Sequence, residues 1–168
     1  MDGAIFTEIQ TFHQNPVVRV AVPLVVLGAV AAATASAAIA SAGPMIAVLA
    51  LVILVMMSLL FMSLRTRVTE QELGFEMFPL IRRRLPIAAI DEVEAVRYNP
   101  IRNGGGWGVR MSFRYGLVVS VSGNRGVRIV AGRKRYLIGS RRPEELAAAI
   151  EVAREAAAEH QGAQLRDV

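Results

Sequence analysis

The sequence predicts a membrane α-helical hairpin followed by a small α+β domain, an antiparallel β-barrel or sandwich capped by one C-terminal helix. Three observations support this prediction. No charged residue occurs between Arg19 and Arg65. After Leu64 the apolar residues stop following a helical period and begin to alternate. Pro143, a favoured first residue of a helix, then opens an amphipathic helical pattern near the end of the chain.

The charge-free stretch is long enough for two membrane crossings, because one crossing needs about 20 apolar residues. It contains one strong turn signal, Gly43-Pro44. We therefore expect a transmembrane hairpin over 17–64, with helices at 17–40 and 45–64. A buried hairpin in a soluble protein and a cleaved signal peptide are the alternatives.

Basic residues flank the cytoplasmic ends of membrane helices more often than the outer ends. Arg65 and Arg67 follow the second expected helix directly, Arg19 lies at the start of the first, and the hairpin loop has no Lys or Arg. The sequence thus predicts a multi-pass protein of the cell membrane, with its N-terminus and C-terminal domain in the cytoplasm.

Small residues recur every four positions along the first expected helix and so share one face. Small residues let two helix backbones approach closely in lipid, where the hydrophobic effect no longer drives association. We expect this face to pack on the second helix, and a homodimer contact through it is the alternative. Its members are Gly28, Ala32, Ser36 and Ala40.

Residues 1–16 precede the first expected membrane helix. Ile5, Ile9 and Phe12 would share one face of a helix, and Asn15-Pro16 would end it. We therefore predict a short amphipathic helix lying in the membrane interface.

The expected β-rich domain covers 65–160, with a tail at 161–168. Between Trp107 and Arg114, apolar residues alternate with Gly, Ser and Arg, which predicts a half-buried strand with Met111 and Phe113 on its inner face. Glu144 and Glu145 suit the first turn of the closing helix, because they complement its dipole. The other expected strands are 73–77, 90–98, 117–121, 126–130 and 134–138.

The order of several short strands and one amphipathic helix resembles the pleckstrin-homology-like fold. The whole chain also resembles a family of small, uncharacterised prokaryotic two-helix membrane proteins with such a domain at the C-terminus. Four segments support this resemblance, which implies a fold and a topology but no activity. They are Phe6–Phe12, Tyr98–Arg102 with Gly105–Gly108, Ser122–Val127, and Ile138–Ser140 followed by Pro143–Leu146.

The residue types exclude several classes of site. The chain has no cysteine and two histidines, so a thiolate nucleophile is impossible and a histidine metal cluster is not expected. The glycines at 104–106 are not followed by the Lys-Ser/Thr of a phosphate loop, and no hydrolase or metalloprotease motif occurs. We therefore expect no catalytic residue, no metal and no cofactor.

Charge indicates what the domain binds. Residues 65–142 contain 16 Lys and Arg against 6 Asp and Glu, a basic surface suited to an anionic partner. No recognition helix or stacking platform is evident, so nucleic acid is not expected. The sequence thus predicts a membrane-anchored, non-catalytic binding module that contacts a protein partner or anionic lipid headgroups. The alternative is a structural scaffold, or a self-assembling part of a membrane complex, without a ligand.

Two sets of residues are candidates for that contact. The first would form a basic surface and the second would contact a ligand through loops, although Trp107 also suits a core or barrel-rim position. The basic set is Arg82, Arg83, Arg84, Arg133, Lys134 and Arg135, and the loop set is Arg102, Trp107, Arg110 and Arg125.

Overall fold

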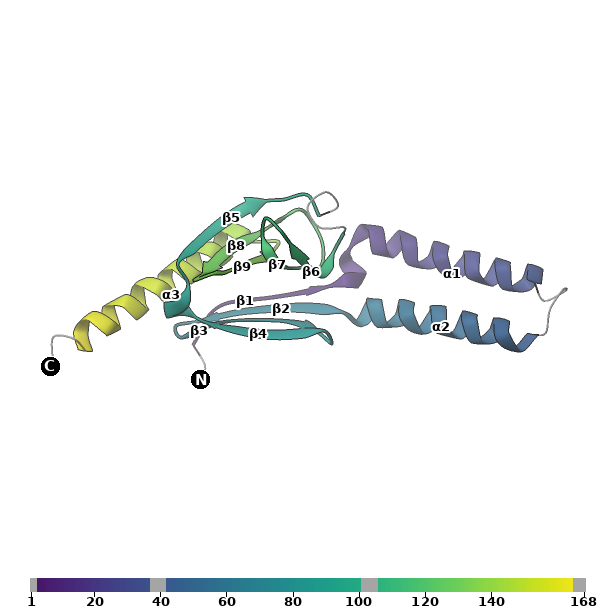
Figure 1. Cartoon of the computed structure of the whole chain (residues 1–168), viewed down its shortest axis with the longest axis horizontal. Coiled ribbons are helices and arrows are strands. Elements are labelled where there is room, and N and C mark those ends of the chain that lie inside the picture. Colours follow the sequence, from purple (N-terminus) through teal and green to yellow (C-terminus); the bar gives the residue numbers. More distant parts are fainter. Residues whose placement is uncertain (1–2, 37–41, 101–105, 165–168) are drawn as a thin grey trace. The chain divides into compact units, whose positions relative to one another are not determined.

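The computed structural model describes residues 3–36, 42–100 and 106–164 (Figure 1). The chain divides into two compact units. One unit is Thr11–Met62, and the other combines Met1–Gln10 with Ser63–Val168. The N-terminal residues therefore belong with the β-rich part of the chain.

The first sheet of the β-rich unit has four strands in sequence order. The pairs β2–β3 and β3–β4 are antiparallel hairpins. Alternate residues of β2 and β3 are buried, which is the pattern of a sheet with one covered face. The strands are β1 (Ala4–Thr11), β2 (Ser63–Thr69), β3 (Glu72–Phe78) and β4 (Ile81–Pro86).

Strand β1 corrects the prediction of an amphipathic helix before residue 16. Phe6, Glu8 and Gln10 are buried in alternation along the strand. The Glu8 carboxylate accepts hydrogen bonds from the Ser140 hydroxyl at 2.5 Å and from the Arg141 backbone N–H at 2.9 Å. A carboxylate that accepts such bonds tolerates burial, so the polar residues, and not the isoleucines, face inward.

The second sheet has five strands in the order β5-β8-β9-β7-β6. Strands β7 and β9 are parallel, and the other neighbouring pairs are antiparallel. All five strands expected from the sequence between residues 90 and 138 are present, with ends shifted by at most two residues. They are β5 (Glu92–Arg97), β6 (Gly108–Ser112), β7 (Gly116–Ser120), β8 (Arg125–Ala131) and β9 (Lys134–Gly139).

The two sheets do not form the closed antiparallel barrel of the predicted pleckstrin-homology-like fold. The described strands remain an α+β arrangement of two sheets, because β4 does not pair with β5. Pro86 ends β4, and the short 3-10 helix η2 (Ile87–Ala89) turns the chain before β5. A barrel requires every strand to bond to two neighbours, and this connection leaves β4 and β5 as end strands.

Helix α3 (Pro143–Gln164) begins at the predicted residue and carries Glu144 and Glu145 in its first turn. Figure 1 shows it running along the five-stranded sheet, where it contacts β5 and β8. Leu146, Ile150 and Ala153 are fully buried on its inner face. Their burial removes apolar surface from water, which is the main source of stability for this contact.

The other unit contains a short 3-10 helix, η1 (Phe12–Gln14), and two longer helices, α1 (Pro16–Ser36) and α2 (Ala42–Phe61). Within the described residues, no helix combines the length and the apolar character that a bilayer crossing requires. This finding contradicts the predicted transmembrane hairpin and the multi-pass localisation with a cytoplasmic domain.

The described helices also differ from the predicted ones in where they begin and end. The prediction counted the charge-free stretch as two complete helices, 17–40 and 45–64. In the structure, residues 37–41 lie outside the described part, and Leu64 belongs to β2. A charge-free stretch therefore does not by itself locate the end of a helix.

The structure describes the surroundings of two members of the predicted small-residue face of α1. Gly28 and Ala32 are exposed, and a Cβ added at Gly28 would meet no atom within 4 Å. Of the other two predicted residues, Ala40 lies outside the described residues, and the Ser36 side chain is not described. The partly covered residues are Val18, Val22, Val26 and Ala29 on α1, and Leu49, Val52 and Met56 on α2.

Candidate binding site

A hollow of about 510 Å³ lies where the β6–β7 turn and the β8–β9 turn approach strand β4. Four cationic side chains line it, from two segments that are far apart in the sequence. No Asp or Glu is among its described lining residues. We call it the basic hollow. Its cations are Arg83, Arg133, Lys134 and Arg135, and its other lining residues are Met111, Ser112, Phe113, Gly116, Leu117 and Tyr136.

The alternation in the sequence placed the apolar lining residues of β6 and the following turn on the wrong side of the strand. Met111 is 76% exposed and Phe113 is fully exposed, although the alternation predicted that both would be buried. The opposite face of β6 turns inward, where Arg110 donates a hydrogen bond to the buried Ser120 hydroxyl at 3.1 Å. Alternation identifies the two faces of a strand but not which of them is covered.

The three arginines of β4 do not act together. Arg82 forms an ion pair with Glu76 at 3.7 Å, and Arg84 pairs with Glu72 at 3.4 Å. Arg83 points to the other face of the strand, because successive side chains alternate, and it lines the basic hollow. Of the first predicted basic triplet, one member therefore reaches the site.

The second basic triplet reaches the hollow as a whole. Arg133, Lys134 and Arg135 lie at the β8–β9 turn, where Gly132 has a φ of +57°. Arg135 donates to the Arg114 carbonyl at 3.3 Å, which ties the turn to the β6–β7 connection. Within the described residues, none of the three basic side chains has a carboxylate partner.

Gly116 brings the two turns together. Its φ is +68°, a conformation that disfavours residues with a Cβ. A Cβ at this position would also collide with the Arg135 carbonyl oxygen. The absence of a side chain therefore lets the β6–β7 turn lie against β9, and this contact shapes the basic hollow.

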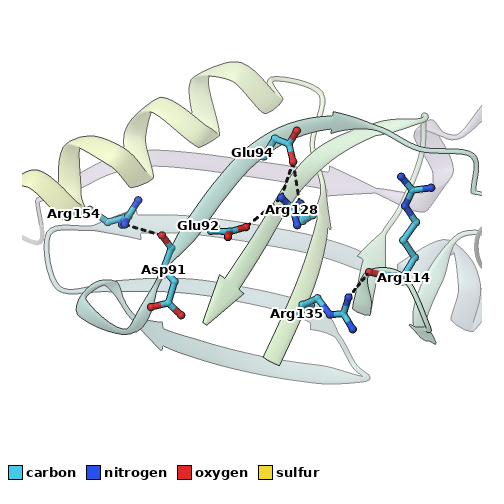
Figure 2. A network of polar contacts seen from close by, with 7 residues as sticks. All are labelled: Asp91, Glu92, Glu94, Arg114, Arg128, Arg135 and Arg154. Atoms are coloured by element: carbon cyan, nitrogen blue, oxygen red, sulfur yellow. Dashed lines mark hydrogen bonds and ion pairs between the residues drawn. The ribbon is translucent and has the colours of Figure 1, made fainter. Parts of the chain in front are cut away.

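The carboxylates of this sheet belong to β5 and to Asp91 directly before it (Figure 2). Arg128 pairs with Glu94 at 2.9 Å and with Glu92 at 3.3 Å. The Asp91 side chain accepts from the Gly132 N–H at 2.6 Å, and the Asp91 carbonyl accepts from Arg154 at 2.9 Å. These acidic residues neutralise the β5 end of the sheet.

The predicted loop residues do not join the basic hollow. The Trp107 indole N–H donates to the Gly123 carbonyl at 3.0 Å, which holds together two connections of the sheet. Arg125 is exposed, and its carbonyl accepts from the Ser140 N–H at 3.2 Å. Arg102 lies outside the described residues.

Arg110 instead belongs to a buried polar group with Tyr98 and Ser120. Burial raises the pKa of the Tyr98 hydroxyl, and Ser120 and Arg110 partly oppose that rise. Burial lowers the pKa of the Arg110 guanidinium, and Tyr98 partly opposes this change. Among the described residues, the Arg110 Nε has no hydrogen-bond partner.

The sequence did not indicate that four apolar residues belong to a binding site: Met111, Phe113, Leu117 and Tyr136. The sequence held one usable signal, since Gly116 follows an aromatic-Arg-aromatic run and marks a tight turn, in which Phe113 is exposed while Tyr115 is buried. Within the described part of the chain, no three His, Cys, Asp or Glu residues are close enough to hold a metal ion.

Comparison with known proteins gave no match among family models, curated proteins or solved structures. The resemblance to a family of small prokaryotic membrane proteins therefore stays a prediction.

Proposed function

We propose that this chain is a non-catalytic binding module that holds an acidic and partly apolar segment of a protein partner in the basic hollow. One observation supports this most directly. Met111 and Phe113 are exposed beside four cationic side chains that have no carboxylate partner within the described residues. Exposed apolar side chains add little to the stability of a fold, so their position beside cations without carboxylate partners in the described part of the chain favours a role in contact.

The arrangement has the composition of a protein interface. Such interfaces have an apolar centre and a polar rim, and Tyr, Phe, Met and Arg are enriched in them. Here Phe113, Met111 and Tyr136 supply the apolar part, while Arg83 and the triplet at 133–135 supply the rim. Methionine adapts its shape to a partner, because its side chain is unbranched and flexible.

The charged and apolar groups would contribute differently to binding. Exposed ion pairs contribute about 0–1 kcal/mol each, and they mainly set the rate of association and the choice of partner. A buried aromatic anchor contributes more, because its contact surface leaves water completely. We therefore expect the cations to select an acidic segment and Phe113 to hold it.

The test uses the full chain and synthetic peptides, with binding followed by fluorescence anisotropy. One peptide alternates Glu with Leu, a second replaces Glu by Gln, and a third replaces Leu by Ser. We expect the first peptide to bind, and each of the other two to bind at least about tenfold more weakly. The triple variant Arg133→Gln, Lys134→Gln, Arg135→Gln and the single variant Phe113→Ser should both weaken binding by a similar factor.

The matched control is Arg82→Gln, which lies next to Arg83 but pairs with Glu76. It removes one positive charge without touching the basic hollow, so affinity should change less than about twofold. Vesicles with anionic or neutral headgroups form a further arm. Binding to anionic vesicles that depends on Phe113 and the triplet, without peptide binding, would overturn the proposal in favour of lipid headgroups.

A structural scaffold without a ligand makes a different prediction. Such a chain would self-associate. Neither the wild type nor the variants of the basic hollow would bind any of the peptides. Analytical ultracentrifugation of the full chain distinguishes this outcome, because a stable oligomer that ignores every peptide would contradict the binding module.

A further inference from the structure

The sheet edges of the β-rich unit differ in how they are protected. An edge strand exposes unpaired backbone N–H and C=O groups, and proteins usually block it with charge, a covering element or side-chain hydrogen bonds. On β4 the block is the run of three arginines, and on β1 Arg142 donates to the Thr7 carbonyl at 3.2 Å. Strand β5 is contacted by α3 and carries the ion pairs of Arg128.

Strand β6 has none of these protections among the described residues. It is the last strand of the five-stranded sheet and pairs only with β7. Its one arginine, Arg110, turns inward to Ser120 and does not guard the edge. No proline interrupts Gly108–Ser112. The free side of β6 is thus able to accept the backbone of another strand.

This free edge is continuous with the basic hollow. Met111 and Ser112 belong to β6 and also line the hollow, and Phe113 follows directly. A segment that pairs with β6 would therefore carry alternate side chains past Met111 and Phe113 and toward the cations at 133–135. Backbone pairing would supply affinity, and the hollow would supply the choice of side chains.

We propose that the partner segment binds in extended form and adds a strand to the free edge of β6. This inference rests on the proposed function and specifies how the same site recognises its partner. The occupant is an acidic extended segment of another protein, because the cations of the basic hollow have no carboxylate partner among the residues that the structure describes. A second copy of this chain fits this edge less well, because its own β6 contains no Asp or Glu that could meet these cations.

The geometry makes a sharp prediction for the peptide backbone. Successive residues of a strand direct their N–H groups to opposite sides, so an added strand uses only every second N–H for pairing. N-methylation of one alternate set of residues in the Glu-Leu peptide should weaken binding at least about tenfold. Methylation of the other set should change it less than about threefold.

Amide hydrogen exchange of the full chain provides an independent reading. In the free chain, one alternate set of β6 amides should exchange fast, because these N–H groups face the free edge. The Glu-Leu peptide should slow that set at least about tenfold and leave the β5 amides unchanged. Amides of β6 that are all protected without peptide would overturn the inference, because the edge would not be free.

The two proposals fail in distinguishable ways. A peptide that binds and tolerates both methylation patterns would overturn strand addition and leave the proposed function standing. A peptide that does not bind at all would overturn both proposals. Formation of a dimer in place of peptide binding, with the β6 amides protected as concentration rises, would identify a second copy as the occupant and overturn the acidic partner.

Discussion

The two edges of the five-stranded sheet, at β5 and at β6, differ in how the charged residues near them are paired. At β5, Arg128 is held by Glu92 and Glu94, and Arg154 is held by Glu151 and by the Asp91 carbonyl. Near β6, Arg133 and Lys134 have no carboxylate partner within the described residues, and Phe113 is exposed beside them. The arginines next to β5 are paired within the fold, whereas the cations of the basic hollow have no carboxylate partner in the described part of the chain.

This difference shows that a basic run in a sequence does not by itself define a basic surface. The surface depends on which arginines the fold supplies with carboxylates. Four predictions test the difference, from the largest expected effect to the smallest.

The largest effect is expected from Gly116→Ala, which disrupts the contact between the β6–β7 turn and β9 that shapes the basic hollow. The substitution combines a disfavoured φ with a collision against the Arg135 carbonyl. We expect the free energy of unfolding to fall by about 2–4 kcal/mol, measured by urea titration of the full chain. Gly132→Ala is the control, since its φ is +57° but its Cβ would meet no atom within 4 Å, so it should cost about 1 kcal/mol.

The next effect is expected at the β5 edge, from Arg128→Gln. The change leaves Glu92 and Glu94 side by side without their shared cation. The free energy of unfolding should fall by about 1 kcal/mol at low salt, and by less at high salt because the interaction is partly exposed. A loss that does not depend on salt would mean that Arg128 acts through packing rather than charge.

The third prediction concerns Tyr98, which follows β5 and lies beside Arg110 of β6. Burial raises the pKa of the Tyr98 hydroxyl in the folded state, so folding favours the neutral hydroxyl. Its contribution to stability is therefore complete below the pKa of about 10 that tyrosine has in the unfolded chain. This contribution is lost as pH rises through the folded pKa. Melting temperatures of wild type should therefore drop above about pH 10, and Tyr98→Phe should reduce that drop.

The smallest effect on stability is expected at the basic hollow. The triple variant Arg133→Gln, Lys134→Gln, Arg135→Gln removes three exposed charges without carboxylate partners. The free energy of unfolding should change by less than about 0.5 kcal/mol in urea titration. A loss as large as that of Arg128→Gln would contradict the contrast between the two edges, because it would show that the triplet stabilises the fold.

Much of the strand pattern could be predicted from local sequence. The strands between residues 90 and 138 were expected from alternation and turn residues, and α3 was expected from Pro143 and the glutamates after it. These signals are local, since each depends on neighbouring residues and on backbone preference. The first strand was missed because the alternation at Phe6, Glu8 and Gln10 includes a carboxylate, and only its contacts with Ser140 and Arg141 make its burial acceptable.

The candidate site could be predicted only in part. The sequence identified both basic triplets, and one complete triplet and one arginine of the other line the basic hollow. It could not show that Arg82 and Arg84 pair with glutamates of β3, because that depends on the β3–β4 register. It also placed Met111 and Phe113 on the covered face, since alternation carries no information about which side of a strand is buried.

The sequence by itself determined the charge balance, the absence of cysteine, and the existence of most strands and of the closing helix, because composition and local periodicity are properties of the chain alone. Tertiary structure decided that the strands form two sheets, that the helices end where they do, and that Arg83 joins the triplet at 133–135. These features depend on contacts between residues distant in the chain. The burial of Arg110 and the exposure of Phe113 followed from the same packing, which sets which face of β6 meets the core.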